Sequence, residues 1–266
     1  MRRLFTLSLI VCTLIVSLGC SINGINIDTV KVGELTRDTE VVALNDADTV
    51  RVDIKMNMGE LRIDGGAEDL LEAEFTYNVA DWKPEVRYQV KESQGRLTIQ
   101  QPKNDKISMS RDIRYQWDLL FNNEVPLDMR VTSGVGTNDF RMGDLNITRV
   151  DFQLGVGDVD IDLSGNTSLT EMNVDMGTGA VTINLTGDWD HDVDVDIQGG
   201  VGRTHLVLPE NVGVRVKVDK GIGDVDVSGL YQRDNMYVNR AYDEADVILK
   251  INIQAGIGQI DLKIEE

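Results

Sequence analysis

The stretch GVGDVDIDL, residues 155–163, joins a Gly-x-Gly triplet to a strict alternation of apolar and polar residues. Alternation with a period of two and one apolar face predicts a half-buried β-strand. The same combination recurs along the chain, with spacings of 21, 22, 23, 21 and 35 residues between successive triplets. The triplets begin at Gly134, Gly155, Gly177, Gly200, Gly221 and Gly256.

Most triplets also follow a second alternating stretch, such as Val193, Val195 and Ile197 before Gly200. Each unit of about 21 residues is therefore predicted to be two short strands joined at a glycine corner. A unit of this size cannot bury a core alone, so the units are predicted to stack. We predict an all-β fold in which residues 131–266 form a β-helix-like, stacked-strand solenoid. The alternative is a β-sandwich of sequential hairpins, which explains the alternation but not the regular column of glycines.

Residues 46–130 are interpreted as a divergent start of the same stack. Gly59 and Gly95 precede similar alternating stretches and stand where the second glycine of a triplet would be. Half of the aromatic residues of the chain lie here, which predicts either a capping core or a platform for a ligand. Capping is favoured, because the terminal coils of a solenoid need to be covered. These aromatic residues are Phe75, Tyr77, Trp82, Tyr88, Tyr115, Trp117 and Phe121.

The first residues carry the features of an export signal. Arg2 and Arg3 precede an uncharged run that ends at Cys20. The segment VSLGC, residues 16–20, is similar to a bacterial lipobox, in which the signal peptide is cut before a cysteine that carries a lipid. This predicts a signal peptide over residues 1–19, lipidation at Cys20 and a tether over residues 20–45, with an uncleaved membrane anchor as the alternative. The other cysteine, Cys12, lies in the signal peptide, so no disulfide is expected in the mature protein.

The charge balance excludes one large class of partners. The 266 residues include 45 acidic and 26 basic side chains, which gives a net charge of −19 and an isoelectric point near 4.4. Nucleic acids and anionic membrane surfaces repel such a chain. Attachment to a membrane is therefore expected through the lipid alone. The protein is expected outside the cytoplasm, at the cell surface or in the periplasm.

Several segments resemble the bacterial toast-rack domain proteins. The downstream repeats resemble LiaF-like and adhesin-type β-repeat domains. Over residues 45–266 this resemblance implies a right-handed β-helical or stacked-strand fold and a place in the cell envelope, where LiaF-like proteins are associated with sensing stress. It implies no catalytic residues. The segments that carry it are GELRIDGGAEDLLEAEF (59–75), KPEVRY (83–88), QGRLTIQQP (94–102), WDLLFN (117–122) and VPLDM (125–129).

The sequence contains no motif for catalysis. The triplets lack the third glycine of a dinucleotide-binding loop, and the chain has no P-loop, nucleophile elbow or zinc-protease motif. Its 2 histidines, His191 and His205, are too few for an ordinary zinc site. Arg203 and His205 share one face of a predicted strand, near Thr182 and Asp226, and form the one cluster in which basic and acidic groups meet. We expect neither an enzyme activity nor a cofactor.

Calcium is the metal that the composition favours, because carboxylates are its ligands. Calcium-binding β-rolls are excluded, since the position two residues after each triplet is never acidic. If consecutive units stack in register, Asp139 lies beside Asp160 and Asp226 beside Asp261. A bound cation would relieve the repulsion within each pair. The alternative is a solvated acidic face that keeps the sheet soluble.

Three functions are compatible with these features. The first is a non-catalytic, lipid-anchored envelope protein whose stacked surface binds an envelope protein or polysaccharide, in stress sensing or adhesion. The second is a calcium-dependent polysaccharide-binding or polysaccharide-active β-helix protein, with the sugar near Trp82 and Trp117. The third is a spacer. Stabilisation by calcium would favour the second function over the first.

Overall fold

The computed structural model describes residues 30–103 and 112–265, in which 15 strands form one sheet. The chain divides into two compact units, and every described strand lies in the larger one, residues 31–104 and 110–266. The predicted signal peptide, residues 1–19, and Cys20 lie outside the described residues. Among the described residues, no helix has the length and apolar character needed to cross a membrane.

Within residues 30–103 and 112–265, the regular secondary structure is β-strand apart from two short 3-10 helices. The N-terminal part contains β1 (Thr36–Val42), β2 (Thr49–Gly65), β3 (Leu71–Tyr77), η1 (Ala80–Trp82), β4 (Glu85–Lys91), β5 (Gln94–Gln100) and β6 (Tyr115–Phe121). Four long strands follow, β7 (Leu127–Arg141), β8 (Ile147–Asp162), β9 (Glu171–Asn184) and β10 (Val193–Pro209). The C-terminal part contains β11 (Gly213–Ile222), β12 (Val225–Ser228), β13 (Tyr231–Arg233), β14 (Met236–Val238), η2 (Arg240–Asp243) and β15 (Ile248–Glu265).

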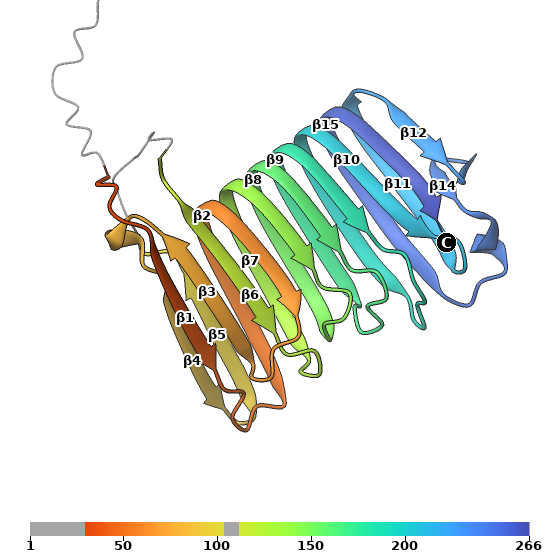
Figure 1. Cartoon of the computed structure of the whole chain (residues 1–266). Coiled ribbons are helices and arrows are strands. Elements are labelled where there is room, and N and C mark those ends of the chain that lie inside the picture. The colour runs from red at the N-terminus through yellow and green to blue at the C-terminus, as the bar shows by residue number, and fades with distance from the viewer. Residues whose placement is uncertain (1–29, 104–111, 266) are drawn as a thin grey trace, which may run out of the picture. The chain divides into compact units, whose positions relative to one another are not determined.

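The long strands are arched and contribute to two faces (Figure 1). In β7, β8, β9, β10 and β15 the burial pattern changes at the glycine triplet, which therefore lies at the bend. In β8 the buried positions between Val150 and the bend are even-numbered, as at Phe152, and those after the bend are odd-numbered, as at Ile161. We call the residues before each triplet the first arm and those after it the second arm. The inner faces of the two arms pack together to form the core. Phe140 of a second arm stacks on Phe152 of a first arm, with ring centroids 5.2 Å apart.

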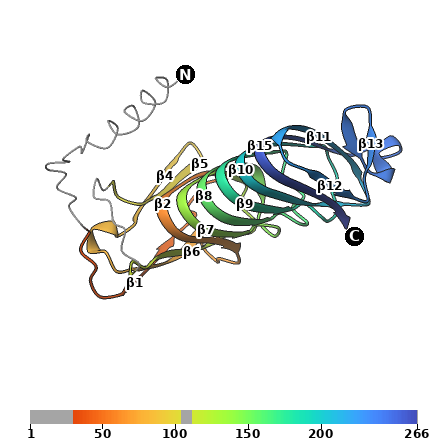
Figure 2. The ribbon, with the colours of Figure 1, turned by 90° about the horizontal axis from the view of Figure 1, so that it is seen from above.

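The bend requires glycine for two reasons. Gly157 has a φ of 147°, which side chains rarely allow, and a Cβ atom there would lie 1.7 Å from the carbonyl oxygen of Gly136 in the neighbouring strand. Figure 2 shows the bends from above as a row of arches. The second glycines are stacked in register in the order Gly59, Gly136, Gly157, Gly179, Gly202 and Gly258.

The strand order confirms the stacked-strand prediction and corrects it at one end. The strands β2, β7, β8, β9 and β10 lie side by side and parallel, which is not the pattern of sequential hairpins. β15 then lies between β10 and β11, so the last repeat of the sequence is an interior strand. The chain between β11 and β15 passes through β12, β13 and β14, and β14 pairs with the other edge of β11.

The N-terminal end of the sheet differs from the repeats. β5 pairs with the first arm of β2 and β6 with its second arm. Gly95 lies opposite Val50 and not at a bend, so the prediction that it stands in the glycine column is wrong. β1 pairs with β3, so residues 36–42 belong to the sheet and not to a tether. The predicted boundary between residues 130 and 131 falls inside β7.

The aromatic residues of this region form a buried cluster. Trp82 and Trp117 are 3% and 0% exposed, and the ring of Tyr115 packs edge-on against both. The Tyr115 hydroxyl donates a hydrogen bond of 2.7 Å to the carbonyl oxygen of Trp82, and burial raises the pKa of this tyrosine far above its usual value. Neither indole has a face open to a ligand. The predicted sugar contact at Trp82 and Trp117 is therefore wrong, and the burial agrees with capping.

Candidate interaction surface

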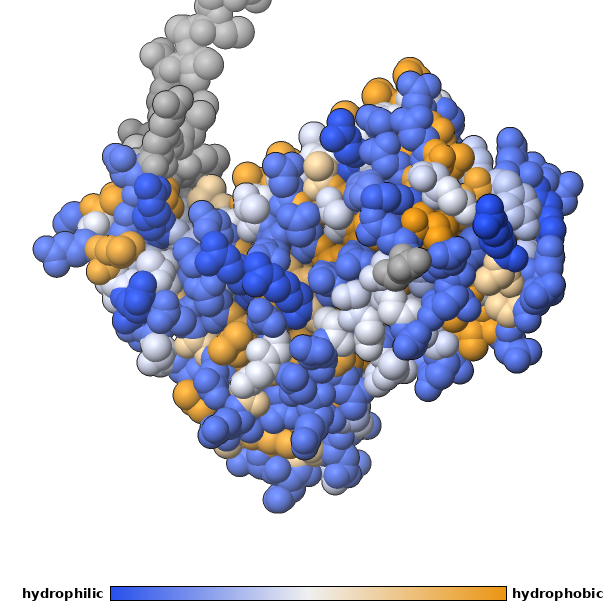
Figure 3. All heavy atoms as spheres, turned by 45° about the vertical axis from the view of Figure 1, so that its right-hand side comes forward, coloured by the Kyte–Doolittle hydropathy of each residue, from blue (hydrophilic) through white to orange (hydrophobic). Residues whose placement is uncertain are grey.

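The middle residues of the triplets form an apolar row along the bends. Each lies between two glycines at a corner, where its side chain points away from both inner faces. The exposed fractions are 52% for Val135, 52% for Val156, 49% for Val201, 51% for Ile257 and 72% for Ile222. Figure 3 shows apolar atoms recurring along the upper edge of the molecule, where the bends lie. We call the aligned residues Met58, Val135, Val156, Thr178, Val201, Ile257 and Ile222 the ridge stripe.

The ridge stripe is continuous from β2 to β11. Adjacent strands lie about 4.8 Å apart, so that the stripe extends over about 29 Å. Single exposed aliphatic side chains are ordinary in proteins, whereas a row of them bordered by polar residues, here interrupted by Thr178, is typical of an interaction site. The glycines on both sides carry no side chains, so a partner can approach the backbone closely.

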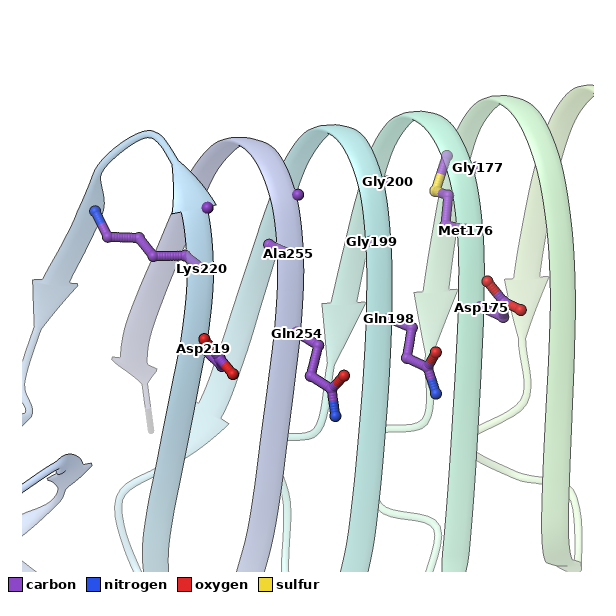
Figure 4. A pocket seen from close by; sticks show the side chains of 12 residues that line it. Asp175, Met176, Gly177, Gln198, Gly199, Gly200, Asp219, Lys220, Gln254 and Ala255 are labelled. Atoms are coloured by element: carbon purple, nitrogen blue, oxygen red, sulfur yellow. The ribbon is translucent and has the colours of Figure 1, made fainter.

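A row of polar side chains borders the ridge stripe on the first arms, as Figure 4 shows. Asp175, Gln198, Gln254 and Asp219 come from the neighbouring strands β9, β10, β15 and β11, and strand pairing aligns them. Together with the glycines of the bends they line an open depression of about 620 Å³, which we call the shelf. Among the described residues, none of these four side chains has a hydrogen-bonding or ion-pair partner. At one end of the shelf, the Lys220 ammonium group donates to the carbonyl oxygen of Gly223.

This surface suits a partner that extends along the stack. The ridge stripe offers apolar contact, while the shelf offers carboxylates that accept hydrogen bonds and amides that both donate and accept them. The shelf is open, unlike the concave pockets that bury most of a small ligand. The signal for the stripe is present in the sequence, since the middle residue is Val or Ile in five of the six triplets. Alternation alone does not reveal that these residues are exposed, because they lie at the bend.

The four acidic residues predicted for calcium lie in two separate pairs. Asp139 is opposite Asp160 and Asp226 is opposite Asp261, as the repeat register predicts, and β9 and β10 separate the two pairs. Asp139 forms an ion pair of 2.8 Å with Arg141. In the described part of the chain, no group of three or more His, Cys, Asp or Glu residues is arranged to hold a metal. Calcium takes about 6–8 oxygen ligands, so binding at these pairs stays a prediction.

The predicted cluster around His205 differs from expectation on one side. His205 lies opposite Thr182, as predicted, but its other neighbour is Asp261 and not Asp226, because β15 lies between β10 and β11. The Arg203 Nε atom is 3.9 Å from the Asp261 carboxylate, and the arginine side chain is 63% exposed. These residues form an exposed ion pair on an open sheet surface. Such a pair contributes little to stability.

His191 links two loops of neighbouring coils. Its Nδ1 atom is 2.6 Å from the Asp190 carboxylate, and its Nε2 atom is 2.8 Å from the carbonyl oxygen of Leu169. The hydrogen bond to Asp190 raises the pKa of His191 above its usual value, and the contact with Leu169 acts in the same direction. Because both ring nitrogens face acceptors, only the protonated imidazole satisfies both contacts.

This geometry predicts a pH dependence of stability. Folding raises the pKa of His191 above its value in the unfolded chain, which is about 6.5. The protonated histidine therefore stabilises the fold fully below that pH, and this stabilisation is lost as the pH rises through the folded-state pKa. We expect the free energy of unfolding in urea to fall between about pH 6 and about pH 8 as His191 loses its proton. The fall should be less than about 1 kcal/mol, because the pair of His191 and Asp190 is partly exposed. His191→Gln should flatten this part of the profile. An unaltered profile in the variant would contradict the assignment.

Comparisons with known proteins find two matching families and several similar solved structures. Residues 31–170 match the family described as the N-terminal domain of toast_rack, and residues 164–262 match "Cell wall-active antibiotics response LiaF, C-terminal". No curated protein matches the chain. The crystal structure of a "putative cell adhesion protein" from Clostridium sporogenes is 26% identical, with a TM-score of 0.67, and covers 87% of this chain and 100% of that one. A "putative adhesin" from Bacteroides fragilis is 10% identical over 86% of this chain and 97% of its own, with a TM-score of 0.34.

The N-terminal match extends from before β1 to the end of the loop after β8, which is more than half of the chain. It includes the aromatic cluster and the first three bends at Gly59, Gly136 and Gly157. The second match begins in that loop and ends within β15. The chain therefore belongs to the toast-rack family, and its residues 164–262 are similar to the C-terminal domain of LiaF.

Proposed function

We propose that the protein is a non-catalytic interaction module of the bacterial cell envelope. In this proposal a lipid on Cys20 holds it to a membrane outside the cytoplasm, and an extended envelope protein or polymer binds along the ridge stripe and the shelf. The observation that carries the proposal is the ridge stripe, in which five aliphatic side chains are each about half exposed or more. The names of the LiaF-like match and of the Clostridium sporogenes protein support a role in stress response or adhesion.

The energetics of the surface favour an extended partner. Covering an aliphatic side chain that is half exposed gains about 0.8 kcal/mol, roughly half of the value for full burial of a valine. These gains add along the stripe only if the partner follows several consecutive strands. The net charge of −19 keeps the isolated protein soluble while the stripe is uncovered.

The polysaccharide alternative keeps part of its support. The two indoles on which a sugar was expected to stack are buried, which removes the aromatic platform. The amides of Gln198 and Gln254 on the shelf remain suited to the hydroxyl groups of a polymer. A polysaccharide therefore stays within the class of partners, bound at the shelf and not at the N-terminal end.

The proposal predicts that binding depends on the ridge stripe. We expect the purified protein to co-sediment saturably with isolated cell envelopes, and a Val156→Ser, Val201→Ser double variant to bind about tenfold more weakly, because about 1.5 kcal/mol of apolar contact is lost. The matched control is Leu35→Ser with Val41→Ser, which removes two aliphatic side chains that are 63% and 61% exposed at the N-terminal end. Equal loss in both double variants would show nonspecific adhesion, and no loss in either would remove the stripe from the binding surface.

A further inference from the structure

The strand β12 lies at the C-terminal end of the second arms (Figure 1). In the described ranges it pairs only with β15, in parallel, and Val225 lies opposite Ile260. The Ile260 amide donates to the carbonyl oxygen of Asp224, at 3.0 Å. In a parallel ladder with this pattern, the amide and carbonyl groups of Val225 and Val227 point away from β15. They face the open edge, where a further strand would find donors and acceptors already aligned.

The core also lacks a cover at this end. The side chains of Val225 and Val227 lie on the inner face, because their partners Ile260 and Leu262 are buried core residues. Val227 is nevertheless 40% exposed, whereas Leu262 is 1% exposed. An added strand with apolar residues on its inner face would complete this layer. The last coil of a solenoid requires such a cover.

The opposite end of the second arms is protected against strand addition. The inner-face positions of its edge strand, β1, include Asp38 opposite Phe75 and Glu40 opposite Ala73. Asp38 is held there by the Tyr77 hydroxyl at 2.7 Å and by the Lys83 ammonium group at 3.1 Å. Inward-pointing charges on an edge strand prevent pairing with another strand. The β12 edge has valines at the equivalent positions and lacks this protection.

The charges around β12 decide what kind of strand can pair with it. Asp224 and Asp226 are exposed on the outer face, and within the described residues neither forms an ion pair. Asp226 accepts one hydrogen bond of 2.9 Å, from the Gln259 amide. A strand added beside β12 places its own outer-face residues next to these two carboxylates. Lysine or arginine is favourable there, and acidic residues are unfavourable.

A second copy of the chain fits this edge poorly. If two β12 strands paired antiparallel with Val225 opposite Val225 or Val227 of the other copy, Asp226 would face Asp224 or Asp226 of that copy, and like charges directly opposite destabilise a sheet. The remaining register, with Val227 opposite Val227, aligns Asp226 with Ser228 and leaves both Asp226 carboxylates without a basic partner. If β1 of another copy paired with β12, its inward-pointing Asp38 and Glu40 would lie against the valine layer. Both arrangements place acidic groups where the edge needs basic or apolar ones.

We propose that β12 is a docking edge for an extended segment of another protein in which apolar residues alternate with lysine or arginine. The apolar residues extend the layer of Val225 and Val227, and the basic residues pair with Asp224 and Asp226. The added backbone forms the ladder hydrogen bonds, as in other cases of strand addition. This edge is separate from the ridge stripe, so the proposal can hold or fail independently of the function proposed above.

The test uses the full-length protein and two fluorescent heptapeptides, Thr-Lys-Val-Lys-Val-Lys-Thr and Thr-Glu-Val-Glu-Val-Glu-Thr, with binding measured by anisotropy. We expect the lysine peptide to bind and the glutamate peptide not to bind. Val227→Pro removes only an outward-facing amide, and Val227→Lys copies the protection found in β1; each should weaken binding at least tenfold. The matched control is Val41→Lys, which adds the same charge on β1 and should leave binding unchanged.

Hydrogen exchange locates the bound peptide. The lysine peptide should slow exchange in residues 224–228 of the wild-type protein and not in the Val227→Lys variant, whose melting temperature confirms that it is folded. Equal binding of the two peptides, absence of binding, or full binding by both Val227 variants would overturn the proposal. A dimer of the wild-type protein that dissociates in both Val227 variants would also overturn it, because the edge would then belong to a second copy.

Discussion

Gly157→Ala is expected to lower the free energy of unfolding by more than about 4 kcal/mol, or to prevent folding altogether. The alanine would have to adopt a φ of 147° with its Cβ atom 1.7 Å from the carbonyl oxygen of Gly136. That oxygen belongs to the backbone of an interior strand, which cannot move without breaking its pairing on both sides. For a domain of this size the corresponding fall in melting temperature is about 8–16 °C.

Two control variants separate the clash from other effects. Gly66 also has a positive φ, 106°, but no atom lies within 4 Å of a Cβ built there, so Gly66→Ala should cost only the backbone strain of about 1–3 kcal/mol. Val156→Ala changes the exposed residue between the two glycines and should stay within about 0.5 kcal/mol. Thermal and urea unfolding followed by circular dichroism give all three values. Equal stability of the Gly157 and Gly66 variants would contradict the steric role of the glycine column.

Ending the chain after Val247, which removes β15, is expected to abolish cooperative folding and to cause aggregation. β15 pairs with β10 on one side and with β11 and β12 on the other, so its removal separates the C-terminal strands from the sheet. The core would lose Leu249, Ile251, Ile253, Ile260 and Leu262, each 0–1% exposed. At about 1.5–3 kcal/mol for each side chain, this loss is similar to the whole stability of a typical domain. The uncovered edge of β10 would also be free to pair with other chains.

The matched control removes the edge strand at the other end. A chain that begins at residue 43 lacks β1, whose residues are mostly exposed and which pairs only with β3 in the described ranges. This variant should fold with a lower melting temperature. Size-exclusion chromatography and thermal unfolding distinguish the two truncations. If the units stacked in chain order, β15 would be a terminal coil and the protein would tolerate its loss. A folded, monomeric protein ending at Val247 would therefore contradict the observed strand order.

Much of the architecture could be predicted from the repeat alone. The alternation after each triplet predicts half-buried strands, and the regular glycines predict that the coils approach closely, which the contact between Gly157 and Gly136 confirms. The pairs Asp139 with Asp160 and Asp226 with Asp261 follow from the same register. The prediction failed at Gly95, because one glycine before an alternating stretch has the same local pattern whether it lies at a bend or within a straight strand.

The two proposed interaction surfaces are less visible in the sequence. The apolar middle residues of the triplets can be read directly, but their exposure depends on the change of alternation at the bend, as between Phe152 and Ile161 in β8. The open edge of β12 could not be predicted, since the sequence does not show which strands have one partner and which have two. The sequence favours a cap over a platform at Trp82 and Trp117, and their burial decides between the two.

Stacked, glycine-cornered strands with one apolar face can be predicted from the amino-acid sequence, because both properties depend on local spacing and on the absence of a Cβ atom at the corner. The order of the last strands cannot, because it depends on contacts between residues far apart in the chain. Every repeat presents similar apolar residues on its inner face, so the side chains of β15 fit beside β10 as well as those of β11 do. The long connection from β11 to β15 allows either strand to lie next to β10. Pairing between whole strands far apart in the sequence places β15 there, and β12 is left with a free edge.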